Sequence, residues 1–210
     1  MKSLILVGGG GHCKSCIDVI RISGEYKITG ILDTADNVGS EVSGIKIIGT
    51  DELISDLARQ DNDFLITIGQ IRSALLRREI YRKIKESGGS LPVIISPRAY
   101  VSASAAIEEG TIIMHDVVVN AEAKVGKACI INTGALIEHE AQIGDYCHIS
   151  TNSVVNGQSR VGNMVFIGSN AVVVNNIIIP DETVVAAGAS ILKTPLEKGI
   201  YIGNPARKGL

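Results

Sequence analysis

The sequence contains no tryptophan, two phenylalanines and five prolines in 210 residues. Aromatic residues make up 3% of the chain although hydrophobic residues make up 45%, so its core must consist of small branched side chains and should be narrow and regular. Twenty-three glycines combined with so few prolines argue against a disordered or collagen-like chain. The length is sufficient for one large domain or for two small domains with cores of their own.

The chain also lacks an excess of positive charge and a long hydrophobic run. It has 20 Lys and Arg against 22 Asp and Glu, which removes the electrostatic case for a nucleic-acid or anionic-membrane partner. The first apolar run ends at Gly8, and no later run approaches the ~18 residues of a membrane span. These absences predict a soluble, cytoplasmic chain with no membrane insertion and no structural disulfide among its four cysteines.

A six-residue repeat fills the second half of the chain. From Ile95 to Ile191 every sixth residue is Ile or Val, at seventeen consecutive positions, and we call these residues the anchors. From Ala99 to Ala189, the residue two positions before the anchor is small at thirteen of sixteen positions. One branched and one small inward residue per hexad predicts stacked coils of 18 residues, each with three short strands that pair in parallel. Gly126, Gly144 and Gly162 recur at the 18-residue spacing, where we expect tight corners with positive φ.

The residues just before the anchors sort onto three outer walls of the expected prism. The first wall carries Tyr100, Val118, Leu136, Val154, Val172 and Ser190. The second carries Ile112, Ile130, His148, Phe166 and Val184, and the third carries Ala106, Lys124, Gln142, Arg160 and Ile178. Two walls are therefore apolar on the outside, and apolar surfaces of that length should be covered by another subunit. Two such walls per prism suit closed cyclic packing and predict a homotrimer.

Strand and helix patterns alternate before the repeat, with strands expected at 2–7, 26–32 and 64–69 and helices at 14–20 and 73–87. This alternation predicts a small parallel α/β sheet. Gly88, Gly89, Pro92 and Pro97 mark the junction with the repeat. We therefore expect two domains, at residues 1–92 and 93–210.

A run of four glycines follows the first expected strand. Backbone N–H groups and a helix dipole both face an anion at such a turn, which favours phosphate binding. Gly8-x-Gly10-x-x-Cys13 is an incomplete dinucleotide fingerprint, and Asp33 lies where a ribose-binding acid would be expected. The alternatives are a nucleotide site and a tight turn of purely structural value. An NAD enzyme is disfavoured because the region lacks the second half of a dinucleotide fold.

The cysteines leave further alternatives open. Cys13-Lys14-Ser15-Cys16 is a C-x-x-C at the start of an expected helix, which is also where a redox pair is found. A zinc site would need a second pair of ligands. Cys129 and Cys147 occupy inward small-residue positions one coil apart, so we interpret them as part of the core and expect no metal.

Among the four histidines, His139 is the best candidate for acid–base chemistry. It lies near an expected corner between Glu138 and Glu140, and a carboxylate bonded to one ring nitrogen makes the other nitrogen a better base. His148 lies half a coil away in an apolar wall, so the two meet more readily across an interface between subunits than within one. His115, with only Asp116 beside it, is assigned no role.

Several of these motifs together resemble a known family. The unbroken hexapeptide repeat that ends in Gly203-Asn204-Pro205-Ala206-Arg207 resembles the left-handed β-helix acyltransferases. The start at 7–12, the stretch 131–140 and His148 resemble the bacterial sugar acetyltransferases of the PglD/NeuD type, which include perosamine N-acetyltransferases. The resemblance spans essentially the whole chain. It implies an α/β Rossmann-like N-terminal domain followed by an all-β left-handed parallel β-helix.

The resemblance also implies an activity, namely acetyl-CoA-dependent N-acetylation of a nucleotide-linked amino sugar in surface-glycan synthesis, by direct transfer. His139 would be the general base and Glu140 would raise its basicity. The acetyl-CoA groove would contain His148, Gly157, Ser169 and Ala187, the last standing where some relatives have glycine. The nucleotide-sugar site would contain Gly10, Gly11, His12, Asp33, Thr34, Gly69 and Asn132.

Three other functions remain open at this point. O-acetylation of a sialic-acid-type sugar is the alternative within the same class, although Glu140 after His139 favours the amine. A non-catalytic β-helix scaffold or binding protein is an alternative of another class, and a C-x-x-C oxidoreductase is a third. The sequence does not specify the sugar, the nucleotide or the ring position that is modified.

Overall fold

The computed structural model describes residues 1–71 and 73–209. Its N-terminal region contains a five-stranded sheet in the order β3-β4-β2-β1-β5. The parallel strands are β1 (Lys2–Val7), β2 (Tyr26–Leu32), β4 (Ile45–Gly49) and β5 (Asp63–Ile66), and β3 (Glu41–Val42) pairs antiparallel with β4. The parallel α/β sheet expected from the alternating pattern is confirmed. The sequence analysis missed β3 and β4.

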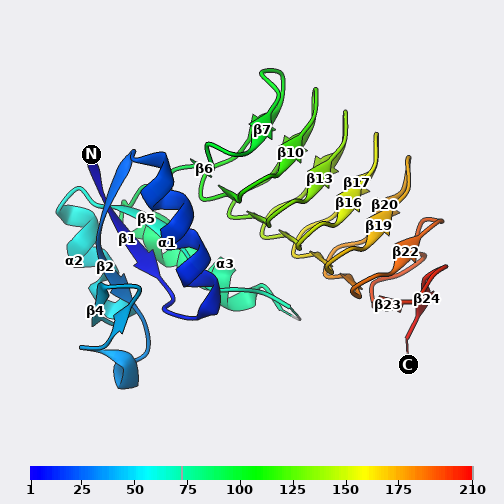
Figure 1. Ribbon diagram of the computed structural model, residues 1–210. Helices are drawn as coiled ribbons and strands as arrows, with labels where there is room; N and C mark the ends of the chain where they lie inside the picture. Colours follow the sequence, from blue (N-terminus) through cyan, green and yellow to red (C-terminus); the bar gives the residue numbers. More distant parts are fainter. Residues whose placement is uncertain (72, 210) are drawn as a thin grey trace.

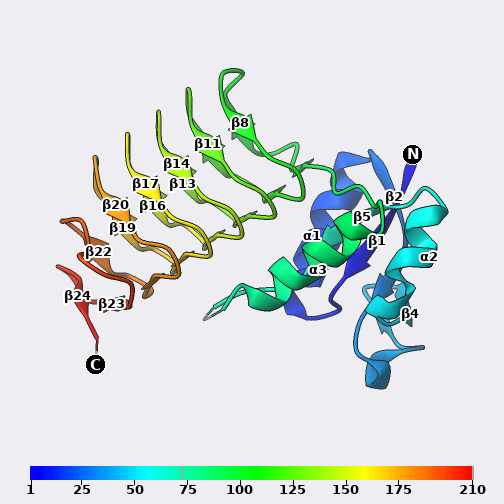
Figure 2. The same ribbon diagram turned by 180° about the vertical axis from the view of Figure 1, so that it is seen from behind.

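Helices cover both faces of this sheet. The chain contains α1 (Gly11–Ser23), η1 (Ala35–Asn37), η2 (Asp51–Leu53), α2 (Ile54–Arg59) and α3 (Leu75–Glu86). Figures 1 and 2 show α1 on one face and α2 and α3 on the other. The strand order reverses beside β1, which has β2 on one side and β5 on the other. In open α/β sheets a ligand binds outside the carboxyl ends of the strands at such a switch point.

The second half of the chain is a parallel β-helix with three sheets, seen as a stack of coils in Figures 1 and 2. The first sheet contains β7 (Tyr100–Val101), β10 (Val118–Val119), β13 (Leu136–Ile137), β16 (Val154–Val155), β19 (Val172–Val173) and β22 (Ser190–Ile191). The second contains β6 (Ile94–Ile95), β9 (Ile112–Ile113), β12 (Ile130–Ile131), β15 (His148–Ile149), β18 (Phe166–Ile167), β21 (Val184–Val185), β23 (Ile200–Ile202) and β24 (Arg207–Lys208). The third contains β8 (Ala106–Ile107), β11 (Lys124–Val125), β14 (Gln142–Ile143), β17 (Arg160–Val161) and β20 (Ile178–Ile179).

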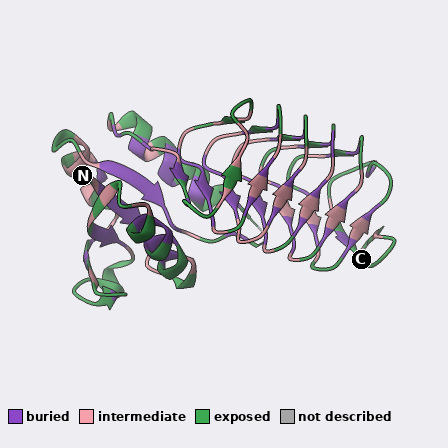
Figure 3. Cartoon of the chain, turned by 45° about the horizontal axis from the view of Figure 1, so that its top comes forward, coloured by how far each residue is buried: buried purple, intermediate pink, exposed green. Residues whose placement is uncertain are grey.

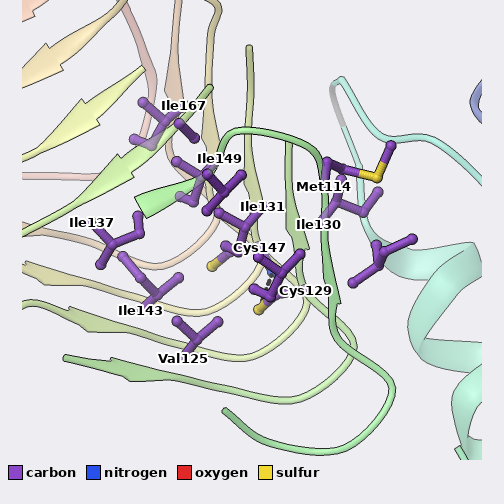
Figure 4. Close-up of a cluster of buried hydrophobic side chains, with 14 of the residues drawn as sticks. Met114, Val125, Cys129, Ile130, Ile131, Ile137, Ile143, Cys147, Ile149 and Ile167 are labelled. Carbon is purple, nitrogen blue, oxygen red and sulfur yellow. Dashed lines mark hydrogen bonds between the residues drawn. The ribbon is translucent and has the colours of Figure 1, made fainter. Parts of the chain in front are cut away.

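The hexad anchors form the core of this prism. From Ile113 to Ile191 every anchor is at most 4% exposed, and Figure 4 shows several of them packed inside the coils beside Cys129 and Cys147. Both cysteines are fully buried, which confirms their interpretation as core residues. Ile95, in the first coil, is 38% exposed, because the end of the stack has no further coil to cover it.

The corners of the coils are left-handed, but at positions other than those expected. Every sixth residue from Gly110 to Gly188 has a positive φ, and most of these residues are not glycine. Gly126, Gly144 and Gly162 do not belong to this series, so our expectation of positive φ at these three glycines was wrong. A Cβ on Gly126 would lie 2.8 Å from the carbonyl carbon of Gly144, so these glycines permit a close approach between successive coils.

The first coils of the second apolar wall are covered by the chain's own N-terminal region. Ile112 and Ile130 are fully buried, and they share a hydrophobic cluster with Cys13, Cys16 and Ile17 of α1. The expectation that other subunits cover both apolar walls is therefore corrected for this part of the second wall, whereas Phe166 and Val184 further along it are only half-buried. The first wall stays half-exposed, as the row of pink strands in Figure 3 shows. Within residues 1–71 and 73–209 no helix has the length and apolarity that crossing a membrane requires.

Candidate active site

A cavity of about 940 Å³ opens at the carboxyl ends of β1, β2 and β5. Its lining includes all but one of the residues expected to hold the nucleotide sugar, namely Gly10, Gly11, His12, Asp33, Thr34 and Gly69. The loop between β1 and α1 brings its glycines here, and Gly10 is the N-cap of α1 without a side-chain cap. The first amides of a 13-residue helix are thus available to an anion. We call this space the nucleotide cavity.

Asp33 fixes the glycine loop. Its Oδ2 accepts a hydrogen bond from the Gly9 amide at 2.7 Å, and its Oδ1 accepts one from the Thr34 amide at 2.7 Å. A Cβ on Gly9 would lie 2.5 Å from Oδ2, so the close approach requires glycine. The carboxylate therefore sets the shape of the cavity besides facing it, and each oxygen keeps a lone pair for a ligand.

A second cavity of about 950 Å³ lies between the N-terminal region and the β-helix. It shares Gly11, His12 and Gly69 with the nucleotide cavity and adds Asn132 and His148 from the β-helix, besides others such as Thr133 and Thr151. The structure thus brings Asn132 and His148 together with His12, although these residues are far apart in the sequence. We call this space the junction cavity.

Both ring nitrogens of His148 are hydrogen-bonded. Nδ1 donates to the carbonyl of Gln70 at 2.7 Å, so Nε2 carries the lone pair and accepts from the amide of Asn132 at 3.1 Å. The orientation of the Asn132 amide follows from its oxygen, which accepts from the Thr133 N–H at 2.8 Å. Burial, and to a smaller extent Arg77, lower the pKa of His148 to about 4, against the opposing effect of the Gln70 carbonyl. His148 is therefore a neutral link between the two regions of the chain.

A buried arginine connects the same regions. Arg77 on α3 is 2% exposed and donates to the side-chain oxygen of Gln70 at 2.8 Å and to the carbonyl of Ala128. Burial, His148 and Arg77 together lower the pKa of His12 to about 3. The two histidines beside the junction cavity are thus uncharged at neutral pH, so neither repels the ammonium form of an amine.

The free energy of unfolding at acid pH should depend on the protonation of these two histidines. Each has a folded-state pKa below the unfolded value of about 6.5, so the unfolded chain binds protons first as the pH falls. For His148 the stability present above pH 6.5 is lost as the pH falls towards 4, by about 2 kcal/mol at pH 5. Urea unfolding of His148→Gln between pH 7 and pH 4 should give a flatter pH dependence than the wild type. Equal slopes would contradict this assignment.

The C-x-x-C does not have the environment of a redox pair. Cys13 and Cys16 are both fully buried, and burial raises the pKa of each thiol. A redox-active pair needs a lowered thiol pKa and access to its substrate, so this environment disfavours the oxidoreductase alternative. Cys16 instead contacts Nε2 of His12 at 3.3 Å.

His139 lies outside both cavities, on an edge of the prism. Its side chain is 54% exposed, and its Nδ1 is 3.3 Å from Oε2 of Glu140. The ring lies against the backbone of Gly157 one coil further on, where a Cβ would come within 2.6 Å of Cε1 and 2.7 Å of Nε2. Since the N–H on Nδ1 faces the carboxylate, the lone pair on Nε2 is available to accept a proton.

The residues expected along the acetyl-CoA groove occupy two different edges. Ser169 and Ala187 follow Thr151 at intervals of 18 residues, on the edge that lines the junction cavity. Gly157 instead lies on the adjacent edge, under His139. Within one chain, His139 therefore does not lie beside either cavity. This agrees with the expectation that His139 and His148 do not meet within one subunit.

The sequence analysis missed two contacts that connect the regions. Gln70 directly follows the expected strand 64–69, at the edge of the sheet where ligands bind. This position could have indicated that Gln70 belongs to the site. His115 is hydrogen-bonded to Ser96 Oγ through Nδ1 at 2.7 Å and to Asp18 of α1 through Nε2 at 3.0 Å. Its neighbour Asp116 pairs with Arg98 instead. Nothing in the local sequence pointed to Asp18.

Two known families match separate parts of the chain. The PglD N-terminal domain family matches residues 3–84. The GMPPB C-terminal domain family matches residues 95–200. Among curated proteins, UDP-N-acetylbacillosamine N-acetyltransferase from Bacillus subtilis is 32% identical over 117 residues. That match spans 54% of this chain and 52% of the enzyme, about half of each.

Solved structures match over nearly the whole length. Perosamine N-acetyltransferase from Caulobacter crescentus, of which a mutant was solved in complex with CoA and GDP-perosamine, is 33% identical. The superposition covers 100% of this chain and 98% of that one, with a TM-score of 0.92. The acetyltransferase domain of PglB from Neisseria gonorrhoeae is 29% identical, with coverages of 99% and 100% and a TM-score of 0.92. The fold expected from the resemblance, including the left-handed β-helix, is confirmed.

Proposed function

The chain belongs to the PglD/NeuD-type family of bacterial sugar acetyltransferases, and from this we propose that it transfers an acetyl group from acetyl-CoA to the amino group of a nucleotide-linked sugar. The observation that carries the proposal is that the two cavities share part of their lining. Gly11, His12 and Gly69 line both the nucleotide cavity and the junction cavity, so a bound nucleotide would extend its sugar towards the β-helix wall. The related perosamine enzyme was solved with CoA and a nucleotide sugar bound.

The N-terminal region, which we assign to residues 1–92, would hold the nucleotide. The amides at the start of α1 suit the diphosphate, and the loop fixed by Asp33 suits the ribose or base. Residues 93–210 would hold acetyl-CoA, with His148, Ser169 and Ala187 along one edge and Gly157 along the next. Acetyl-CoA is here a substrate, and the proposal assigns no metal.

His139 would act as the general base. The amine nitrogen attacks the thioester carbonyl and forms the amide bond, while Nε2 of His139 takes the proton that the amine loses. The carbon–sulfur bond then breaks, and the CoA thiolate leaves and takes up a proton. Glu140 beside Nδ1 would stabilise the imidazolium that forms. Because the thioester is already activated, alignment of the two substrates supplies much of the rate.

Direct transfer fits the cysteines better than an acyl-enzyme does. Cys13, Cys16, Cys129 and Cys147 are all fully buried free thiols, so none can reach a thioester as a nucleophile. Free thiols in this number also suit a reducing compartment. We therefore propose a cytoplasmic enzyme that serves surface-glycan synthesis. The relatives named above as N-acetyltransferases favour the amine over the hydroxyl of a sialic-acid-type sugar.

A homotrimer would complete the active site. In one chain His139 lies away from both cavities, on the edge next to the one that lines the junction cavity. The first outer wall, with Leu136, Val154 and Val172 along it, is half-exposed and apolar. Packing of that wall against a neighbouring chain would cover it and would place the His139 edge of one prism beside the junction cavity of another.

A panel of acceptors tests the proposed reaction. UDP-, GDP-, CMP- and dTDP-linked amino sugars are each incubated with acetyl-CoA, and release of the free CoA thiol is followed together with the mass of the product. We expect thiol release that depends on one of the amino sugars and an increase in mass of one acetyl group. The matched sugars that carry a hydroxyl group in place of the amino group should give no release. Release with the hydroxy sugars alone would establish O-acetylation, and no release with any acceptor would favour a scaffold.

A further inference from the structure

The His139–Glu140 pair needs support that its own coil does not provide. Both side chains are about half-exposed, and water competes for each of their hydrogen bonds. A carboxylate on an exposed corner has many rotamers, and only some of them face Nδ1. Within the same coil the other acidic neighbour, Glu138, is already occupied, because its Oε2 accepts from the side chain of Asn120 and from the His139 N–H.

The support comes from the next coil. Gln158 occupies the left-handed corner 18 residues after Glu140, with φ of 59° at both positions. Its Nε2 donates to Oε2 of Glu140 at 3.0 Å, the same oxygen that faces Nδ1 of His139. Its backbone N–H donates to the carbonyl of His139 at 3.1 Å. Gln158 therefore contacts both members of the pair, one through its side chain and one through its backbone.

We propose that Gln158 is a positioning residue that holds the Glu140 carboxylate against Nδ1 of His139. This inference rests on the proposed role of His139 as the base. The repeat itself fixes the geometry, because corner residues of successive coils stack directly above one another. A neutral amide suits the position, since it supplies an N–H donor without a charge that would compete with the imidazole for Glu140.

Substitutions of Gln158 should change kcat and the pH profile with little effect on either KM. Gln158→Met keeps the length of the side chain but removes the donor, and we expect a decrease in kcat on the order of tenfold, the size of one charge-assisted hydrogen bond. The acid limb of kcat/KM should move to lower pH, because the carboxylate no longer stays beside the imidazolium. Gln158→Glu adds a negative charge near His139, Glu138 and Glu140, so it should move the limb to higher pH.

Two controls separate positioning from a structural role. Asn176→Ala changes the corresponding left-handed corner one coil further on, and it should leave kcat and the acid limb unchanged. Gln158→Met combined with Glu140→Ala should be no slower than Glu140→Ala alone, because residues that act as a unit are not additive. Wild-type kcat and an unshifted limb in Gln158→Met would overturn the proposal.

A measurement without substrates keeps this inference separate from the proposed reaction. NMR of the ¹⁵N-labelled His139 ring in the full-length protein should show the Nδ1–H tautomer in the wild type, and in Gln158→Met the ring signals should shift towards a mixture of the two tautomers. If the wild type acetylates no sugar but these shifts occur, the reaction is wrong and the positioning is right. If the wild type is active and the shifts are absent, only the role of Gln158 is wrong.

Discussion

Replacement of His139 by alanine is expected to lower kcat by a factor of roughly 10² to 10⁴, the usual contribution of a positioned general base. His148 cannot take its place, because both of its ring nitrogens are already hydrogen-bonded within the chain. The KM values for acetyl-CoA and for the sugar should change little, since the ring would act on the proton and not on either carrier. Initial rates with the best acceptor of the panel measure the effect.

The variant should otherwise be intact. The His139 side chain is about half-exposed and packs against one glycine, so its loss removes little buried surface. Sedimentation equilibrium should give the mass of three chains for the wild type and for His139→Ala alike. A variant with near-normal kcat would contradict the assignment of the base. A single-chain mass for the wild type would contradict the proposed assembly.

Gly157→Ala is the second substitution from which we expect a large effect, a decrease in kcat on the order of 10²-fold. A Cβ at this position would come within 2.6 Å of the His139 ring, and the ring, not the backbone, must move. A displacement of about 1 Å from the productive position is enough for such a loss. Since the φ of Gly157 is not positive, alanine itself fits the backbone there, and the thermal midpoint should change little.

The matched control is Asn175→Ala, at the corresponding corner position one coil further along the same edge. It should leave kcat unchanged, because it adds no atom near the ring. The double variant His139→Ala/Gly157→Ala should be as slow as His139→Ala and no slower. If Gly157→Ala instead raised the KM for acetyl-CoA at constant kcat, Gly157 would act mainly in the cofactor groove, the role that the family resemblance implies.

The repeat made most of the fold predictable. An unbroken series of Ile and Val at a spacing of six leaves the chain one way to bury them all. The order of the three walls follows because every third hexad returns to the same wall. The glycine run and Asp33 were also predictable, because they stand at the strand ends of an α/β pattern. Local spacing determined each of these features, so the sequence alone was sufficient.

Contacts between the two regions were not predictable. His148 is linked to Gln70 across 78 positions of the chain, and His115 is linked to Asp18 across 97. No periodicity joins such residues, since their approach depends on how α1 and α3 pack on the second wall. That packing also explains why Ile112 and Ile130 on this wall are buried without a partner subunit. The apolar pattern alone could not distinguish a neighbouring chain from the chain's own first half.

The regular turn at every sixth residue has a consequence for how this protein can change in length. A deletion or insertion within the stack that is not a multiple of six would turn every later anchor away from the core. An insertion or deletion of six or twelve residues would keep the anchors inside but would move the later outer walls to a different side of the prism. Only changes by whole coils of 18 residues would therefore be tolerated. Even one added coil before Ile130 would carry His148 about 4.8 Å away from the Gln70 loop. The contact with Gln70 therefore fixes the number of coils that precede His148, and we expect length variation to be confined to the coils beyond Phe166.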